Sequence, residues 1–270
     1  MDIFSVVILG FIEGLSEFLP ISSTGHMILG AKLLGLEQDK TLKCFEVVIQ
    51  LGSILAVIVM FFKRLGRDFN LIIKLIIGFV PTGLIGLMLY KYIKELFSPN
   101  TVAYALIVGG VIFIIVEWYK LRKNKINFKQ ISTISTQANT QDEISQISYK
   151  HAFIIGLAQC FAMIPGTSRS GATIIAGLLC GLSRQAAAAF SFLLAVPTML
   201  VATLYDSYKN REIFIENSQN ILWFLLGGAV AFVVALLVLR LFLRFVSRFS
   251  YISFGVYRII LGTIFLLFVL

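Results

Sequence analysis

The sequence predicts an all-α, polytopic membrane protein made of two inverted-topology repeats, each a re-entrant helical hairpin followed by three transmembrane helices. Three observations support this: a strongly apolar composition, two polar stretches broken by proline, and a constant spacing between the two halves. Hydrophobic residues make up 58% of the 270 residues and charged residues 14%, with a mean hydropathy of +0.91. Soluble domains carry about 25% charged residues, so the chain belongs in a membrane.

The first repeat is predicted over residues 1–120. Its hairpin covers about 3–35, because Pro20 divides an apolar run into two helices that are both short for a hydrocarbon layer of about 30 Å. An irregular backbone at membrane depth is tolerated where it lines a protein-walled cavity, which favours a re-entrant hairpin. Three spans follow, at about 44–62, 71–90 and 102–118, with Pro81 as an expected kink.

A polar connector is predicted over 121–150, because residues 127–148 are rich in Ser, Thr, Gln and Asn. The second repeat covers 151–270. Its hairpin, at about 152–182, is broken at Pro165, and its spans lie at about 186–204, 221–239 and 252–270.

The two halves align with one constant shift. Pro20 and Pro165, Phe45 and Phe190, and Gly83 and Gly228 each lie 145 residues apart (165 − 20 = 145). Because each half holds an odd number of spans, the second copy must be inverted relative to the first.

The basic loops follow the same inversion. The loop after the first span is basic in the first half (63–67), whereas the loop after the second span is basic in the second half (240–248). The positive-inside rule then places the connector in the cytoplasm and both termini outside. The net charge of +9 is explained by these clusters at the ends of apolar runs, so membrane lipids and not nucleic acid are the expected partners.

The first polar stretch, residues 13–26, contains candidate metal ligands and a candidate nucleophile. Glu13 and Glu17 lie four residues apart, so a helix would direct both carboxylates to one side, where they could share a cation. Ser22, Ser23 and His26 supply hydroxyls and a base. Ionisable groups at this depth usually face a cavity and carry function.

The second polar stretch, residues 165–173, is a candidate anion site. It gathers Arg169 at the start of a helix, and a guanidinium and helix N-terminal amides both favour phosphate oxygens. The residues expected to bind phosphate are Arg169, Ser168, Ser170, Gly171, Thr173 and Ser22. The carboxylate pair would repel a phosphate unless a divalent cation, Mg²⁺ or Ca²⁺, lay between them. The hypothesis is phosphoryl transfer.

Alternatives remain open at this point. Ser23 is our choice of nucleophile, with His26 as proton shuttle; His26 as phosphoryl acceptor is the rival assignment and Ser22 a weaker one. A secondary transporter or lipid flippase is the alternative class, since transporters also use inverted repeats with broken helices. Release of phosphate from a prenyl diphosphate separates the two classes. Glu46 and Gln50 are given a packing or supporting role, and Arg258 is expected to be a structural charge paired with an unnamed partner.

At these residues the sequence resembles the bacterial undecaprenyl-diphosphate phosphatases associated with bacitracin resistance. The likeness covers nearly the whole chain and rests on two signatures, formed by Glu13, Glu17, Pro20, Ser22, Ser23, Thr24, Gly25 and His26, and by Pro165, Gly166, Ser168, Arg169, Ser170 and Thr173. The resemblance implies a divalent-cation enzyme that hydrolyses the C55 diphosphate to the monophosphate carrier of peptidoglycan synthesis. It also implies a multi-pass protein of the bacterial cytoplasmic (inner) membrane. The catalytic residues would be Ser23, His26, Glu17 and Arg169, in an active site that opens to the periplasmic side. A homodimer is one assembly to consider.

Overall fold

All regular structure in the described part of the chain is helical. The computed structural model describes residues 1–96, 98–123, 144–216 and 218–268. The helices, in chain order, are α1 (Ile3–Ser16), α2 (Ser23–Leu33), α3 (Lys40–Val48), α4 (Gln50–Leu65), α5 (Phe69–Glu95), α6 (Pro99–Lys123), α9 (Tyr149–Gln159), the 3₁₀ helix η2 (Cys160–Met163), α10 (Arg169–Leu179), α11 (Arg184–Lys209), α12 (Glu212–Glu216), α13 (Ser218–Arg248) and α14 (Ile252–Phe268).

Five of these segments are long and apolar enough to cross a membrane. They are Lys40–Leu65, Phe69–Leu89, Pro99–Arg122, Arg184–Lys209 and Gln219–Arg248. The prediction of an all-α polytopic membrane protein is therefore confirmed. The sixth expected span, 252–270, corresponds to α14, a shorter apolar helix of 17 residues, and the last two residues of that span lie outside the described part of the chain.

The span expected at 44–62 lies within Lys40–Leu65. It is made of two helices, α3 and α4, which meet at Ile49, where the Gly52 amide bonds to the Ile49 carbonyl at 3.0 Å in a tighter turn. Pro81 lies inside α5, which continues through it to Glu95, and the kink expected there stays a prediction. Most of the connector expected at 121–150 lies outside the described residues.

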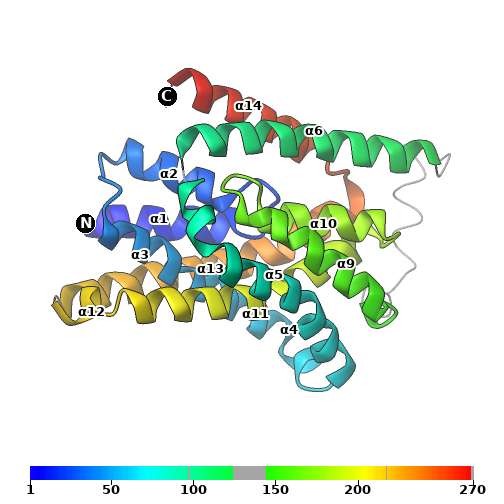
Figure 1. The fold of residues 1–270 in the computed structure, drawn as a ribbon, viewed down its shortest axis with the longest axis horizontal. Helices are drawn as coiled ribbons and strands as arrows, with labels where there is room; N and C mark the ends of the chain where they lie inside the picture. Colours follow the sequence, from blue (N-terminus) through cyan, green and yellow to red (C-terminus); the bar gives the residue numbers. More distant parts are fainter. Residues whose placement is uncertain (97, 124–143, 217, 269–270) are drawn as a thin grey trace.

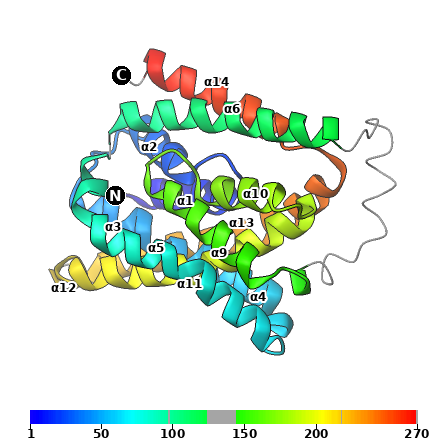
Figure 2. The same cartoon turned by 45° about the vertical axis from the view of Figure 1, so that its right-hand side comes forward.

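Each proline-broken stretch folds as a pair of short helices whose first helix packs on a long one. Helix α1 packs on α13 and α9 packs on α5, while α2 packs on α1 and α10 on α9. Glycines allow the close approach: a Cβ atom at Gly10 would lie 2.6 Å from the Gly227 carbonyl oxygen, and one at Gly156 would overlap the Gly78 carbonyl. Figures 1 and 2 show both pairs below the long helix α6.

The second helix of each pair begins at a serine with unusual backbone geometry. Ser22 has φ 71° and Ser168 has φ 74°, and among the described residues these are the two non-glycine residues with positive φ. Each hydroxyl caps its helix: Ser22 Oγ accepts from the Gly25 amide at 3.5 Å, and Ser168 Oγ accepts from the Gly171 amide at 3.1 Å. The two loops therefore turn into their helices by the same local structure.

The ends of the elements lie at two opposite ends of the molecule. In Figure 1 both termini and α12 lie at the left, whereas the C-terminal ends of α4 and α6 lie at the right. Helices α6 and α14 pack along each other over the two hairpins, and α11 contacts α4, α5 and α10. Most residues of α11 between Ala186 and Ala195 are buried, so this helix forms the centre of the core.

Candidate active site

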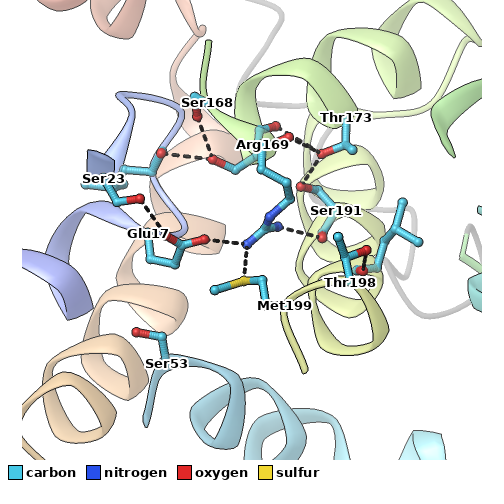
Figure 3. A network of polar contacts seen from close by, with 12 residues as sticks. Glu17, Ser23, Ser53, Ser168, Arg169, Thr173, Ser191, Thr198 and Met199 are labelled. Carbon is cyan, nitrogen blue, oxygen red and sulfur yellow. Dashed lines mark hydrogen bonds and ion pairs between the residues drawn. The ribbon is translucent and has the colours of Figure 1, made fainter. Parts of the chain in front are cut away.

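The two hairpin loops meet through an ion pair. Glu17, at the C-terminal end of α1, accepts a hydrogen bond at Oε1 from Nη2 of Arg169, at the start of α10, with a distance of 2.9 Å. Figure 3 shows the two side chains pointing toward each other from different hairpins. The structure thus brings the two polar stretches together. Both side chains are largely buried, so the pair is held in a protein-walled site.

Ser23 contacts the other oxygen of the same carboxylate. Its Oγ donates a hydrogen bond to Glu17 Oε2 over 2.6 Å. A short contact of this kind orients the hydroxyl and gives its proton an acceptor. Glu17 therefore links Ser23, the candidate nucleophile of the first hairpin, with the Arg169 guanidinium of the second.

Arg169 is fixed on several sides. Its Nη1 donates to the Ser191 carbonyl at 3.0 Å, its Nη2 also lies 3.3 Å from the Met199 sulfur, and the guanidinium stands 5.7 Å from the centre of the Phe18 ring. Its Nε is buried without a hydrogen-bond partner. Since an arginine has five donors, this orientation leaves donor capacity for an anion.

The remaining polar residues of the second loop mainly hold the loop itself. Ser170 Oγ donates to the Leu19 carbonyl of the first loop at 3.0 Å and lies 3.1 Å from Ser168 Oγ. Thr173 Oγ1 lies 2.6 Å from Ser191 Oγ and donates to the Arg169 carbonyl at 2.9 Å. Thr173 therefore binds α10 to α11, and Ser170 binds one hairpin loop to the other.

Glu13 lies one helical turn before Glu17 and is fully buried. Its Oε1 accepts from Ser53 Oγ at 3.3 Å, whereas its Oε2 is buried and has no hydrogen-bond partner. A buried carboxylate oxygen without a donor costs free energy, so this atom is suited to a cation. In the described part of the chain no three His, Cys, Asp or Glu side chains gather at one point, so a metal here would need other ligands as well.

A cavity of about 150 Å³ lies between the two loops. Of the predicted site residues, Glu17, Ser22, Ser23, Ser168 and Arg169 line it, whereas Glu13, His26, Ser170, Gly171 and Thr173 do not. Its lining is Glu17, Ser22, Ser23, Thr24, Gln50, Ala162, Met163, Pro165, Gly166, Ser168, Arg169 and Met199. Sequence reasoning gave Gln50 only a supporting role and did not single out Met199.

His26 is turned away from Ser23. Its Nδ1 lies 2.8 Å from the Ser22 carbonyl oxygen, and its Nε2 lies 2.7 Å from the Tyr257 hydroxyl. A carbonyl only accepts, so Nδ1 carries a proton, and in the neutral ring Nε2 accepts from Tyr257. The predicted Ser23–His26 pair is not formed in this structure, and Tyr257 is a contact that sequence reasoning missed.

The structure corrects the expectation for Arg258. Its guanidinium is fully buried and contacts backbone carbonyl oxygens, not the side-chain partner that was expected. The described carboxylates in ion pairs are Glu17, with Arg169, and Glu117, with Arg184.

Comparison with known proteins places the chain among related sequences over its full length. The family model of the bacitracin resistance protein BacA matches residues 6–264. A protein of Campylobacter fetus subsp. fetus named undecaprenyl-diphosphatase is 65% identical over 271 residues, covering 100% of both chains. Proteins of the same name from Campylobacter hominis and Persephonella marina are 64% and 54% identical, each again over 100% of both chains.

Proposed function

The chain belongs to the bacitracin resistance protein BacA family, and from this premise we propose that it hydrolyses undecaprenyl diphosphate in the cavity between its two hairpin loops. Its products are undecaprenyl phosphate and inorganic phosphate, so it recycles the lipid carrier of the cell wall. The observation that carries the proposal is the double contact of Glu17, which joins Ser23 of one hairpin to Arg169 of the other. The prenyl tail would lie between helices while the diphosphate enters the cavity.

The proposed nucleophile is Ser23. Its Oγ attacks the terminal phosphorus, its proton passes to Glu17 Oε2, and the bond from that phosphorus to the bridging oxygen breaks. The electron pair leaves with undecaprenyl phosphate, and a phosphoserine remains. Water then attacks the phosphorus of this ester, and the bond from phosphorus to Ser23 Oγ breaks. Glu17 returns its proton to Ser23 Oγ, and the released inorganic phosphate keeps the protons of the water. The 2.6 Å contact between Ser23 and Glu17 supports the first proton transfer.

Arg169 is proposed to stabilise the transferred phosphoryl group. The unpartnered Nε and the contacts to Ser191 and Met199 support this, because the guanidinium is already held in one orientation. Preorganised donors in a dry site are the largest single source of rate enhancement in phosphoryl transfer. When substrate binds, the phosphoryl oxygens would share Arg169 with Glu17.

A divalent cation, Mg²⁺ or Ca²⁺, is proposed to bind at Glu13 and Glu17. The unpartnered, buried Oε2 of Glu13 supports it. When bound there, such an ion would supply positive charge to neutralise the diphosphate oxygens. Gln50, which lines the cavity, is a further oxygen ligand of the right chemistry.

His26 keeps its proposed role as proton shuttle for the leaving group or the attacking water. This role requires the ring to exchange its Tyr257 contact for one with the reacting oxygen, since both ring nitrogens are engaged elsewhere. Catalytic hydrogen bonds often form only with substrate bound.

We also propose that residues 1–120 and 151–270 are inverted repeats. The matched serine caps at Ser22 and Ser168 (168 − 22 = 146) support this, as do the matched packing of α1 on α13 and of α9 on α5. In the cytoplasmic (inner) membrane, the basic ends of α4 and α13 would face the cytoplasm and the site would open to the periplasm. A homodimer would be detected by cross-linking in membranes.

The test is phosphate release from undecaprenyl diphosphate by the purified protein in detergent, with and without a chelator. We expect release that chelation removes and that added Mg²⁺ or Ca²⁺ restores. A matched transport assay in vesicles addresses the alternative class, because a flippase or transporter would move lipid without releasing phosphate. Absence of release from folded protein would overturn the proposal.

A further inference from the structure

We propose that Arg258, in α14, is a positioning residue that holds the two hairpin loops in register for the reaction. The inference deepens the proposed function and rests on it. Arg258 does not line the cavity, and the residues that do line it come from the two loops and from other helices. Its effect on the reaction would therefore pass through the backbone of the two loops.

All five N–H donors of Arg258 are used, and all five acceptors are backbone carbonyl oxygens. Nη1 donates to Pro20 at 3.2 Å and to Thr167 at 2.9 Å, so one nitrogen bridges the two loops. Nη2 donates to Gly166 at 3.0 Å and to Ala105 at 3.0 Å, and Nε donates to Leu106 at 3.3 Å. The guanidinium thus fixes both loops against α6.

The bridged atoms lie next to the residues that do the chemistry. Pro20 stands between Glu17 and Ser23 in the chain, and Thr167 comes two residues before Arg169. A shift of either loop would change the Glu17–Ser23 and Glu17–Arg169 distances, now 2.6 Å and 2.9 Å. Misplacement of a catalytic group by 1 Å can cost about 100-fold in rate.

Lysine cannot replace this arrangement, although it keeps the charge. A lysine ammonium has three donors on a flexible stem, whereas the planar guanidinium serves five acceptors at fixed angles. A buried guanidinium charge is unfavourable without hydrogen-bond partners. The charge of Arg258 therefore favours the arrangement in which the five carbonyl groups stay in place around it. Helix α6 makes room for it: a Cβ atom at Gly109 would overlap Arg258 Nη2.

The experiment compares Arg258→Lys with the wild type in the phosphate-release assay, on protein whose folded fraction is measured by size exclusion and thermal melting. We expect kcat to fall about 100-fold while KM changes less than about threefold, because the prenyl tail is bound elsewhere. Gly109→Ala perturbs the same guanidinium from α6 and should lower kcat at least about tenfold, which tests the proposal even if Arg258→Lys does not fold.

A double-mutant cycle adds a readout that a purely structural role would not change. If Arg258 acts by placing Arg169, then Arg258→Lys in an Arg169→Lys background should cost less than about twofold in kcat. Arg184→Lys is the matched control: it alters a partly buried arginine whose partner is the fully buried Glu117 carboxylate, and it should lower the melting temperature with kcat within about twofold.

Three outcomes would overturn the inference: an Arg258→Lys kcat within about threefold of the wild type, full additivity in the cycle, or a loss equal to that of Arg184→Lys at the same folded fraction. If Arg258→Lys does not fold, a normal kcat for Gly109→Ala overturns it. If the wild type releases no phosphate, the proposed function fails. If the wild type is active and the variants have the same kcat, the proposed function stands and the inference about Arg258 fails.

Discussion

Glu17 uses its two carboxylate oxygens in different directions, one toward the Ser23 hydroxyl and one toward the Arg169 guanidinium. An amide in its place would keep the shape but lose the negative charge. It would also turn one acceptor into a donor, facing either a hydroxyl or a cation. The residue is therefore the most sensitive single position of the proposed mechanism.

We expect Glu17→Gln to lower kcat by about 10²- to 10³-fold without preventing membrane insertion, because the charge that orients Ser23 and Arg169 is lost. Phosphate release by purified protein measures the effect. Glu46→Gln is the matched control, since Glu46 bonds only to Gln38 among the hydrogen bonds seen for its carboxylate in the described residues. Near-normal turnover by folded Glu17→Gln would contradict the assignment of Glu17.

The nucleophile can be identified from the chemistry of the trapped enzyme. A phosphoserine is stable to acid, whereas a phosphohistidine is not. With substrate labelled in its terminal phosphate, we expect an acid-stable label on the peptide containing Ser23, absent from Ser23→Ala and still formed in His26→Ala.

Two other results would change that mechanism. An acid-labile label that persists in Ser23→Ala would assign the phosphoryl group to His26. The absence of any covalent label would favour direct attack by water, with a nearby base removing its proton.

At the scale of elements, Ser22 and Ser168 each hold a strained backbone conformation with a positive φ. A non-glycine residue in this conformation costs roughly 1–2 kcal/mol, partly offset by a helix cap worth about 1 kcal/mol. Ser168→Gly and Ser168→Ala both remove the cap at Gly171, but only alanine keeps the strain.

We therefore expect Ser168→Ala to melt at a lower temperature than Ser168→Gly, by the equivalent of roughly 1 kcal/mol. Thermal unfolding in the same detergent measures the difference. If glycine proved the less stable replacement, the φ of 74° at Ser168 would not describe the protein in detergent.

The ion pair between α6 and α11 should act on stability and not on the reaction. Arg184 donates from Nε and Nη2 to the two oxygens of fully buried Glu117, at 2.9 and 2.7 Å. Removing one partner of a buried pair costs about 3–5 kcal/mol. We expect Glu117→Gln to unfold at a markedly lower temperature, while kcat measured on the folded fraction stays close to that of the wild type.

How far the sequence predicts these elements depends on the signal that each one carries. Long apolar runs and the prolines at 20 and 165 predicted the spans and the two hairpins, because hydrophobic length and proline geometry are local properties. The tighter turn at Ile49, inside the expected span, was not predicted, since nothing in that apolar run marks it. The direct Glu17–Arg169 contact was not predicted, because the sequence analysis expected a cation between the carboxylate pair and the phosphate.

The rest of the site depends on side-chain direction, which the sequence does not reveal. Met199 and Gln50 reach the cavity from helices that carry no motif. His26 faces Tyr257, more than 200 residues away, instead of Ser23, three residues away. A shift of 146 residues, the one that also relates Ser22 to Ser168, gives Gln159 the position of Glu13 (159 − 13 = 146). Gln159 donates to Thr82 and Thr198 instead of offering a charge.

At the scale of the whole molecule, the two ends seen in Figure 1 give the orientation a direct test. We replace the three native cysteines, which are free thiols, by serine and add single cysteines at exposed positions. A cysteine at Gln146 should react with a membrane-impermeant reagent only from the cytoplasm, and one at Arg211 only from the periplasm. Reaction of both from one side would contradict the inverted arrangement.

The five carbonyl contacts of Arg258 also bear on how related sequences can diverge. Every residue type offers the same main-chain oxygen, so an exchange at Thr167 or Ala105 leaves the hydrogen bond to Arg258 in place. These positions are under no pressure to change together with position 258. Methods that infer contacts from correlated substitutions would therefore not detect the connection between α14 and the two loops, however many relatives were aligned.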